Sequence, residues 1–371
     1  MNKEVIVIGG NHHNTLSVLR SLGEKGVLSL LIVVSHDTKP YVGYSKYIKE
    51  KAVINSEDEI LSAMYSLHRS SDKAVVIACS DAISSYLDSN YDILSVNFIL
   101  PGSTEAGRIS RLMNKNTMTQ LAKDCGMSVP RSWGVHTKND IEDVTYPCIV
   151  KPLVSKNGSK ADIAICSLKL ELEKYLEHCS CRKLQIQEYI TKKIEFQLIG
   201  CSLNGGEQII IPGAAIILRQ PINTNTGFLR YIPIKEFQYD RESCAEFIRK
   251  TGYSGLFSLE FIRDKKGTDY FMEINFRNDG NSICVTASGM NLPYIWYIYN
   301  CGRSIEKELC YDSMKEVLVM PEFNDIGNAI HHRISWCNWL KDVKNTDRFM
   351  EFSRHDQKPF WMYIVKRIFH I

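Results

Sequence analysis

Apolar runs and amphipathic stretches alternate along the first hundred residues of the chain. Residues 4–8 form an almost unbroken apolar run before two glycines, and similar runs occupy residues 28–34 and 74–79. Continuous apolar runs of this length are typical of parallel strands that are buried on both faces. The stretch 15–22 repeats leucine at helical spacing between the first two runs. The alternation predicts a parallel α/β domain over residues 1–105.

The pattern changes after residue 105. A helical stretch is predicted over residues 108–126, and it is followed by strand-like segments and one further helix. The predicted strands cover residues 146–151, 161–166 and 184–190, and the helix covers residues 168–178. Residues 106–190 therefore hold two predicted helices and three predicted strands.

The third region, residues 191–310, is richer in strand signals. Residues 195–219 are apolar and strand-like, and residues 240–251 have helical periodicity. Two strands are predicted over residues 256–263 and 270–277, with a polar loop between them. The remaining residues, 311–371, are mixed and rich in aromatic side chains, and we treat them as a C-terminal extension.

The two strands around the polar loop carry the strongest chemical signal. If Arg263 pairs with Tyr270, Glu260 lies directly opposite Glu273 in an antiparallel hairpin. Side chains alternate along a strand, so Asn275 lies on the same face as Glu273. Two opposed carboxylates destabilise a hairpin unless something neutralises them. The register therefore predicts a neutralising partner at this point of the sheet.

A hard divalent cation is one such partner. Mg²⁺ prefers oxygen ligands and often binds one or two carboxylates together with substrate phosphates. Asn275 adds a neutral oxygen, and Arg277 adds a fixed positive charge suited to phosphate or carboxylate. The alternative is a solvated polar face whose charges pair with nearby Lys or Arg. The combination of residues favours a metal–phosphate site over that alternative.

Two further features fit phosphate chemistry. Lys151 ends an apolar strand, where a lysine needs an anionic partner. The loop after it, residues 155–160, is small and polar and contains Gly158, so its backbone N–H groups could contact phosphates. It lacks the spacing of a P-loop. Glu188 falls on the apolar face of a predicted strand. It is either at the edge of the sheet or at the rim of a pocket, where it could accept hydrogen bonds.

Composition restricts the class of protein. The 371 residues contain 45 Lys and Arg against 42 Asp and Glu, which argues against a dedicated nucleic-acid binder. No signal peptide and no membrane-spanning run are visible. The twelve cysteines are scattered and lack paired metal-site spacing, so we expect free thiols in a cytoplasmic protein.

In this order, the motifs of residues 1–300 resemble the ATP-grasp superfamily, and most of all its carbamoyl-phosphate-synthase-like branch of carboxylate–amine ligases. The resemblance implies an α/β protein, α+β in its C-terminal part, with a Rossmann-like N-terminal domain followed by an ATP-grasp fold. It implies a lid-like small domain over 106–190 and an Mg/ATP domain over 191–310. Phe276 stands where the family commonly has Pro, and the glycine loop carries one Gly rather than several.

The resemblance also implies roles for single residues. Lys115 and Lys151 match the phosphate-binding lysines, and the glycine loop matches at Ser155, Gly158 and Ser159. The adenine-binding hinge is similar at Gln187, Glu188, Tyr189 and Ile190, and Glu195 matches the ribose carboxylate. The Mg²⁺ (or Mn²⁺) ligands match at Glu260, Glu273 and Asn275. The phosphate and acyl-phosphate contact matches at Arg277, and Arg219 lies where the family often has a basic residue near the site.

The implied activity is ATP-dependent ligation of a small-molecule carboxylate to an amine through an acyl phosphate. Gly10, Asn11 and His12 follow the first strand and are candidate substrate contacts, although a plain strand-to-helix turn explains them equally well. Another ATP-grasp reaction, carboxylation or carbamoyl-phosphate formation, is an alternative. A non-catalytic nucleotide-binding protein is a third reading, which the opposed carboxylates disfavour. A homodimer is compatible with the sequence.

The last residues, Lys358–Ile371, are basic and aromatic. Such a segment could lie on an anionic membrane surface. The sequence favours a helix docked on the protein over that alternative.

Overall fold

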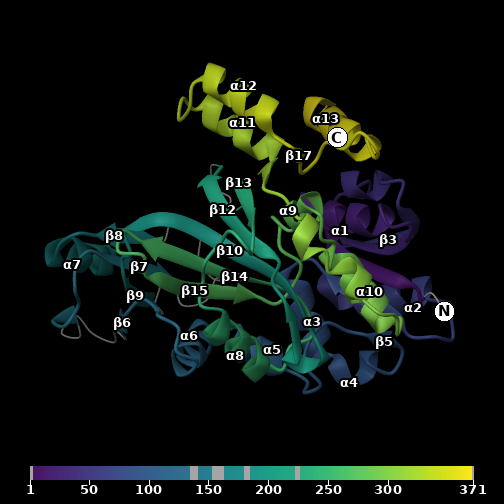
Figure 1. The fold of residues 1–371 in the computed structure, drawn as a ribbon, viewed down its shortest axis with the longest axis horizontal. Helices are drawn as coiled ribbons and strands as arrows, with labels where there is room; N and C mark the ends of the chain where they lie inside the picture. The colour runs from purple at the N-terminus through teal and green to yellow at the C-terminus, as the bar shows by residue number, and fades with distance from the viewer. Residues whose placement is uncertain (1–2, 134–140, 153–162, 179–183, 222–225, 370–371) are drawn as a thin grey trace.

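A computed structural model describes residues 3–133, 141–152, 163–178, 184–221 and 226–369, with the side chains of Lys151 and Pro152 excepted. The predicted glycine loop, with Ser155, Gly158 and Ser159, lies outside these residues. In Figure 1 a parallel sheet near the N-terminus, a long curved sheet and a small distal sheet follow one another, with the C-terminal helices along one edge.

The N-terminal sheet is parallel and has the strand order β3-β2-β1-β4-β5. Its strands are β1 (Val5–Gly10), β2 (Ser29–Val34), β3 (Ile48–Ile54), β4 (Ala74–Ala78) and β5 (Phe98–Ile99). Its helices are α1 (His13–Gly23), α2 (Ile60–Leu67), α3 (Asp81–Ser89) and α4 (Tyr91–Leu94). The three apolar runs of the sequence are confirmed as β1, β2 and β4. The strand β3 was missed because its sequence, Ile-Lys-Glu-Lys-Ala-Val-Ile, mixes charges into an edge strand.

The two faces of β1 explain its continuous apolar run. Val5 and Val7 belong to one buried cluster, whereas Ile6 and Ile8 belong to another on the opposite face. Successive side chains of a strand point to opposite faces, so a sheet covered on both faces needs apolar residues at every position. Helices α9 (Ile283–Ser288) and α10 (Leu292–Asn300) supply part of one cover, and Trp296 Nε1 donates to the Val76 carbonyl at 3.1 Å.

The predicted single helix over residues 108–126 is two helices, α5 (Arg108–Leu112) and α6 (Lys115–Asp124). The prediction was wrong because Asn114 interrupts it. Asn114 has an extended backbone, and its side chain accepts hydrogen bonds from the amides of Asn116 and Thr117, which starts a new helix. The break places Lys115 at the first turn of α6.

The small distal sheet confirms the strands predicted for the second region. It has the order β6-β9-β7-β8, with antiparallel pairs between β6 (Ser132–Trp133), β7 (Cys148–Pro152), β8 (Ala164–Cys166) and β9 (Leu184–Glu188). Helix α7 (Lys169–His178) packs on β8 and shares its small core.

The third sheet has eight strands in the order β15-β14-β10-β12-β13-β16-β17, with β11 beside β10. Its strands are β10 (Lys192–Leu203), β11 (Gln208–Ile210), β12 (Gly213–Arg219), β13 (Phe228–Pro233), β14 (Gly255–Asp264), β15 (Asp269–Asn275), β16 (Val317–Met320) and β17 (Arg348–Phe349). The helix predicted over residues 240–251 is α8 (Arg241–Thr251), and the carboxylate of Asp240 caps its first turn. Aromatic residues such as Phe196, Phe257 and Phe271 fill the core beneath this sheet.

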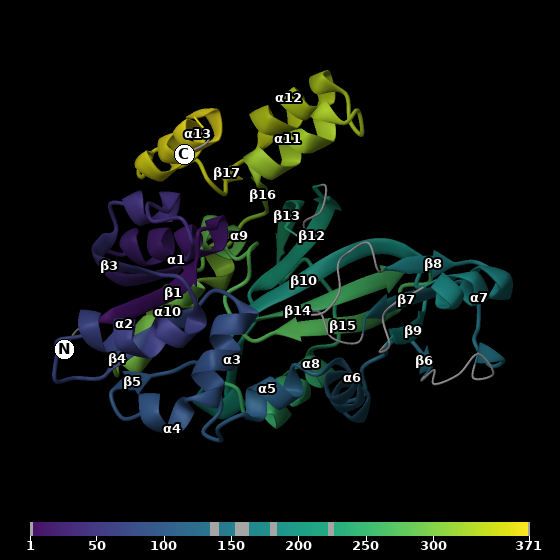
Figure 2. The same ribbon diagram turned by 180° about the vertical axis from the view of Figure 1, so that it is seen from behind.

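The C-terminal extension contributes β16 and β17 to the large sheet. Helices α11 (Glu322–Ile330) and α12 (Trp336–Asn345) lie between these two strands in the chain, and α13 (Lys358–Phe369) follows β17. Figure 2 shows these helices gathered along one side of the molecule. The buried Arg20 ties the extension to α1: it donates to Asp356 at 3.1 Å and to the carbonyls of Met350 and Glu351. The short 3-10 helices are η1 (Tyr41–Tyr44), η2 (Glu57–Glu59), η6 (Asn204–Gly206), η7 (Glu306–Glu308) and η8 (Tyr311–Ser313).

The cysteines of the described residues are free thiols, and Cys179 and Cys181 lie outside those residues. Among the described helices, none combines the length and the apolar character that a bilayer-spanning segment requires.

Candidate functional site

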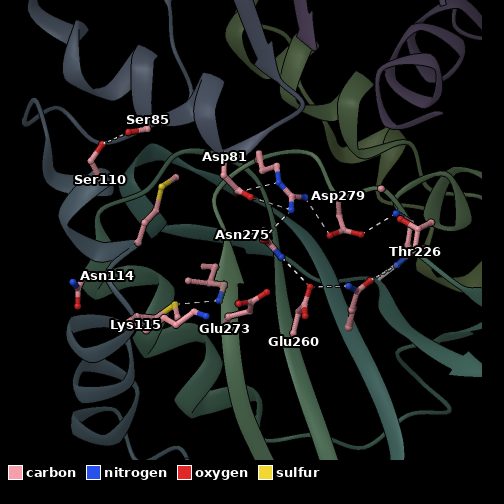
Figure 3. A pocket seen from close by; sticks show the side chains of 17 residues that line it. Asp81, Ser85, Ser110, Asn114, Lys115, Thr226, Glu260, Glu273, Asn275 and Asp279 are labelled. Atoms are coloured by element: carbon pink, nitrogen blue, oxygen red, sulfur yellow. Dashed lines mark hydrogen bonds and ion pairs between the residues drawn. The ribbon is translucent and has the colours of Figure 1, made fainter. Parts of the chain in front are cut away.

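A cavity of about 580 Å³ opens where the large sheet meets the N-terminal domain and the two helices that follow it. Its floor is the end of the β14–β15 hairpin, with Glu260, Glu273 and Asn275. One wall is the start of α6, and the other is the loop that follows β15 (Figure 3). Three segments far apart in the sequence thus meet at one site.

The structure confirms that Glu260 lies opposite Glu273, although the pairing nearer the hairpin loop differs from the one predicted. Glu260 pairs with Glu273 as predicted, but Arg263 pairs with Asp269 rather than with Tyr270. The register shifts by one residue between Glu260 and Phe261, so Met272 is the extra residue of a β-bulge. Because the bulge shifts the register by one residue, the predicted pair at the site is correct although the predicted pair next to the loop is wrong.

The opposed carboxylates sit in unequal surroundings. One Glu260 oxygen accepts hydrogen bonds from Gln197 Nε2 and Asn275 Nδ2, each at 3.0 Å. Burial and the nearby charge of Glu273 raise the pKa of Glu260 well above its usual range. A buried carboxyl with this bias favours its neutral form unless a cation joins it. As predicted from the sequence, the Glu260–Glu273 pair of the folded protein requires a proton or a cation to neutralise it.

Arg277 is a cation in the same cavity as this pair, and several acceptors hold it. Its guanidinium donates to Asp81 at 3.0 Å, to Asn275 Oδ1 at 2.9 Å and to Asp279 at 3.4 Å. Burial opposes its charge, but Asp81 and Asp279 more than offset burial and raise the pKa of Arg277. The guanidinium is thus a fixed positive charge on the cavity wall. Since its bond takes the Asn275 oxygen, the amide nitrogen of Asn275 faces Glu260.

Lys115 reaches the same cavity from the opposite wall. Figure 3 shows its side chain directed toward Glu273. The helix that carries it packs on β15, where the amide of Ile274 donates to the Met118 sulfur at 3.3 Å. The structure therefore brings together Lys115, Arg277, the two glutamates and Asn275, which the sequence had singled out separately.

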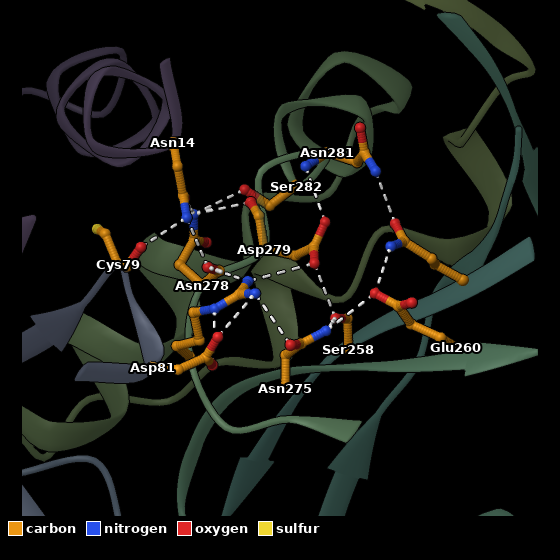
Figure 4. A network of polar contacts seen from close by, with 12 residues as sticks. Asn14, Cys79, Asp81, Ser258, Glu260, Asn275, Asn278, Asp279, Asn281 and Ser282 are labelled. Atoms are coloured by element: carbon orange, nitrogen blue, oxygen red, sulfur yellow. Dashed lines mark hydrogen bonds and ion pairs between the residues drawn. The ribbon is translucent and has the colours of Figure 1, made fainter. Parts of the chain in front are cut away.

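Four residues that sequence reasoning missed complete the site: Asp81, Gln197, Asp279 and Asn281. Asp279 accepts from Ser258 Oγ at 2.9 Å and from the amide of Asn281 at 2.8 Å. Asn281 donates to Gln197 at 2.8 Å, and Gln197 donates in turn to Glu260 (Figure 4). The polar run Asn-Asp-Gly-Asn-Ser at 278–282, directly after an apolar strand, was a signal for this loop.

The loop is also joined to the N-terminal domain. Asn14 donates to the carbonyls of Asn278 at 2.8 Å and Cys79 at 2.9 Å. The amide of Asn278 donates to the Ala78 carbonyl at 3.0 Å. These bonds fix the cavity wall relative to the carboxyl end of β4.

The predicted hinge residues lie outside the lining of this cavity. Gln187 is buried in β9 and donates to Ser132 at 3.2 Å, and Glu188 accepts from the Arg131 amide at 3.2 Å. The Tyr189 amide donates to the Pro147 carbonyl at 3.1 Å, and Ile190 is buried. The backbone of Lys151 runs in β7, antiparallel to β9. These residues occupy the junction of the small sheet with the large one.

Two predicted residues are engaged elsewhere. Glu195 pairs with Lys192 at 2.9 Å and accepts from Gln220 at 2.9 Å. Arg219 does not line the cavity: its guanidinium pairs with Asp325 at 2.7 Å and Asp342 at 2.8 Å. The structure thus places Arg219 as an anchor for α11 and α12, because the fully buried Asp325 requires a cationic partner.

The candidate substrate contacts serve local structure. The Gly10 carbonyl accepts from Thr15 at 2.7 Å, and Asn11 bonds Asp37 and the Val42 amide. His12 caps α1, with Nδ1 accepting from the Asn14 amide at 3.3 Å. None of the three lines the cavity described above.

The described residues hold no group of three or more His, Cys, Asp or Glu side chains arranged for a metal ion. The candidate cation site consists instead of two carboxylates and one amide. This donor set suits a hard cation that takes its remaining ligands from phosphates and water.

No family model matches the chain. Two formate-dependent phosphoribosylglycinamide formyltransferases are similar in sequence. The one from Bacteroides thetaiotaomicron is 24% identical over 198 residues, which are 50% of this chain and 50% of that protein. The one from Wolinella succinogenes is 23% identical over 244 residues, 61% and 58% respectively. The matches thus span little more than half of these relatives.

Solved structures with the same fold include an L-amino acid ligase from Bacillus licheniformis, with a TM-score of 0.63 at 16% identity, covering 85% of this chain and 78% of that one. Biotin carboxylase from Campylobacter jejuni, in complex with ATP, has a TM-score of 0.64 at 17% identity, covering 85% and 74%. The chain shares a mixed α/β fold with these solved structures, and the similarities agree with the resemblance to the ATP-grasp superfamily.

Proposed function

We propose that this protein is an ATP-dependent carboxylate–amine ligase that acts through an acyl phosphate, with Mg-ATP bound beside the β14–β15 hairpin. The observation that carries the proposal is the pairing of Glu260 with Glu273 inside a cavity that also holds Lys115 and Arg277. Opposed acids between two cations form an arrangement suited to a metal-bound phosphate chain.

The residues present fit a divalent cation. Glu260 and Glu273 would hold it, and burial already disfavours an uncompensated charge on Glu260. Asn275 would join as a ligand through its oxygen, for which its amide has to reverse from the orientation that bonds Glu260. When bound, Mg²⁺ neutralises charge on the phosphates, and Mn²⁺ shares this oxygen chemistry.

The protein's own groups supply positioning and charge. Lys115 and Arg277 face the cavity from opposite walls, so they can offset negative charge that develops during phosphoryl transfer. The transfer joins the terminal phosphate of ATP to a substrate carboxylate and releases ADP. An amine then attacks the carbonyl carbon, the amide forms, and inorganic phosphate leaves. Excluding water from the cavity protects the acyl phosphate from hydrolysis.

The positions of the adenine, the ribose and the phosphate chain follow from the family resemblance. We place adenine at the hinge of Gln187, Glu188, Tyr189 and Ile190, the ribose at Glu195, and the phosphates near Lys151 and the loop with Ser155, Gly158 and Ser159. Solved structures of similar proteins in complex with ADP or ATP support a nucleotide in this fold.

The domain division predicted from the sequence belongs to the same proposal. Residues 1–105 form a Rossmann-like domain, 106–190 the lid, 191–310 the Mg/ATP domain and 311–371 the extension. The strand order β3-β2-β1-β4-β5 supports the first assignment, because doubly wound sheets begin with it.

The test is product analysis. The purified chain is incubated with Mg-ATP and pairs of amino acids or other carboxylates and amines, ADP and phosphate are quantified, and products are weighed by mass spectrometry. The proposal expects a product equal to the two substrates minus one water, formed together with one ADP. A product heavier by carbon dioxide would indicate a carboxylase, and the absence of ADP with every pair that forms a complex would contradict a ligase.

A further inference from the structure

We propose that the C-terminal extension binds the surface of an anionic lipid bilayer through α12 and the outer face of α13. The proposal concerns where the enzyme works and is independent of its reaction. It rests on how α13 is docked, on the clustering of exposed apolar side chains and on the charge around them.

Helix α13 is attached to the protein by one face. Tyr363 contacts Tyr41 edge-on at 5.0 Å and stacks on Phe323 at 4.3 Å, measured between ring centroids. Phe360 also stacks on Phe323, at 5.1 Å. Lys366 pairs with Asp37 at 2.8 Å. The docked helix that the sequence favoured is therefore present, and its orientation is fixed by these contacts.

The opposite face of α13 is apolar and exposed. Four apolar side chains on this face are exposed: Trp361 by 54%, Val365 by 38%, Ile368 by 64% and Phe369 by 65%. They recur at steps of four, three and one residues, which places them on one stripe of a helix with 3.6 residues per turn. A helix held by one aromatic face thus presents a second apolar face to its surroundings.

The extension concentrates such side chains. Seven of the sixteen large hydrophobic side chains that the described residues leave exposed lie between residues 321 and 369. The other three of the seven are Ile330, Trp336 and Leu340, and the last two are one turn apart on α12. Exposed apolar residues that are scattered along a chain need no explanation, but such a concentration in one part of the fold points to an interaction surface.

The charged side chains around this surface are mostly basic, which favours an anionic partner. Among the described residues 321–369, the exposed charged side chains are basic with the exception of Asp347: Arg333, Lys341, Lys344, Arg354, Lys358 and Arg367. The acids Asp325, Glu351 and Asp356 are buried and carry internal contacts. A surface of Trp, Phe and Ile among Lys and Arg matches the interface of a bilayer with anionic headgroups.

The experiment is vesicle flotation of the full chain. Vesicles of phosphatidylcholine alone are compared with vesicles of phosphatidylcholine and phosphatidylglycerol, at low and high salt. We expect binding to the anionic vesicles that weakens with salt, and an about tenfold loss of binding for the variant Trp361→Ser/Ile368→Ser. The matched control Ile93→Ser/Val96→Ser changes two side chains that are equally exposed on the N-terminal domain, and it binds as the wild type does.

A second variant keeps the test decisive if the serine variant fails to fold. Lys341→Glu/Lys344→Glu changes two exposed charges of α12 and leaves α13 and its docked face unaltered, and it should lose binding to anionic vesicles while keeping the wild-type melting temperature. Wild-type protein that stays with the unbound fraction in both vesicle types overturns the proposal. So does a dimer in solution that Trp361→Ser/Ile368→Ser dissociates, since a second copy then covers the face. ATP turnover is measured on the same samples, so a failed ligase assignment is seen separately.

Discussion

Glu260 and Glu273 stand directly opposite each other across the β14–β15 hairpin, and Glu260 accepts hydrogen bonds from the side-chain amides of Gln197 and Asn275. Directly opposed residues have Cβ atoms about 5 Å apart, where like charges repel. The pair therefore stores unfavourable energy that a bound cation relieves. Several consequences can be measured.

Removing one charge of the pair should stabilise the protein without ligand. We expect Glu273→Gln to raise the free energy of unfolding by about 1 kcal/mol, which corresponds to about 1–3 °C in melting temperature. Differential scanning calorimetry measures this change. Glu236→Gln, at an exposed position on the same domain, is the control and should leave the melting temperature unchanged. A lower melting temperature for Glu273→Gln would show that the carboxylates already have a stabilising partner.

Gln197 orients Glu260 through an amide that Asn281 holds from its other side. Replacing Gln197 with Leu removes that donor, so we expect the Mg²⁺ concentration for half-maximal turnover to rise about tenfold. Turnover at saturating Mg²⁺ should fall much less. The exposed Gln208 on β11 is a matched control for the same substitution. Equal Mg²⁺ dependence in Gln197→Leu and wild type would remove Gln197 from this role.

Arg219 separates an anchoring role from a catalytic one. Arg219→Ala leaves the buried carboxylate of Asp325 without its cation, and breaking such a pair costs about 3–5 kcal/mol. We expect a large drop in the free energy of unfolding by urea, with ATP turnover per folded molecule kept within about threefold of the wild type. Arg230→Ala, which removes a solvent-accessible partner of Glu316 just before the neighbouring strand β16, should change stability by less than about 1 kcal/mol. Loss of turnover in folded Arg219→Ala would restore the catalytic role that the resemblance implied.

The buried acids Glu322 and Glu351 predict how stability depends on pH. Burial raises the pKa of both carboxyls, and the charge of Glu351 adds to the increase for Glu322. A carboxyl with a raised pKa keeps its proton in the folded state, whereas the unfolded chain releases it above about pH 4.5. The free energy of unfolding should therefore fall as pH rises from the unfolded value through the folded one.

The variant Glu351→Gln removes one of these ionisations and should show a shallower fall between acidic and alkaline pH, by about 1 kcal/mol. Urea unfolding over a series of pH values measures the slope. The exposed Glu306→Gln serves as the control and should keep the wild-type slope. A slope that Glu351→Gln leaves unchanged would mean that this carboxyl is ionised in the folded protein.

Local patterns predicted the elements that one segment determines by itself. The runs of β1, β2 and β4 were found because a strand covered on both faces must be apolar throughout. The edge strand β3 was missed, since its charges suit solvent as well as a sheet. The break before Lys115 was missed because it depends on the side-chain cap of Asn114 rather than on periodicity.

In the site, too, the residues set by one local segment could be predicted, and those brought together by folding could not. The hairpin residues Glu260, Glu273 and Asn275 could be predicted because strand alternation and register relate positions close in sequence. Gln197 and Asp81 could not be, since they come from other strands and domains and meet the hairpin only in the folded chain. The bulge at Met272 could not be predicted either, because it forms only in the folded sheet. It is the reason why Glu260 faces Glu273 although Arg263 does not pair with Tyr270.

Binding of Mn²⁺ tests the central claim most directly. Free Mn²⁺ is followed by electron paramagnetic resonance while the protein is added in the presence of a non-hydrolysable ATP analogue. The wild type and Arg219→Lys should remove Mn²⁺ from solution with equal affinity, and the variant Glu260→Gln/Glu273→Gln should bind it at least about tenfold more weakly. Mn²⁺ binding by that variant with wild-type affinity would contradict a cation site between Glu260 and Glu273.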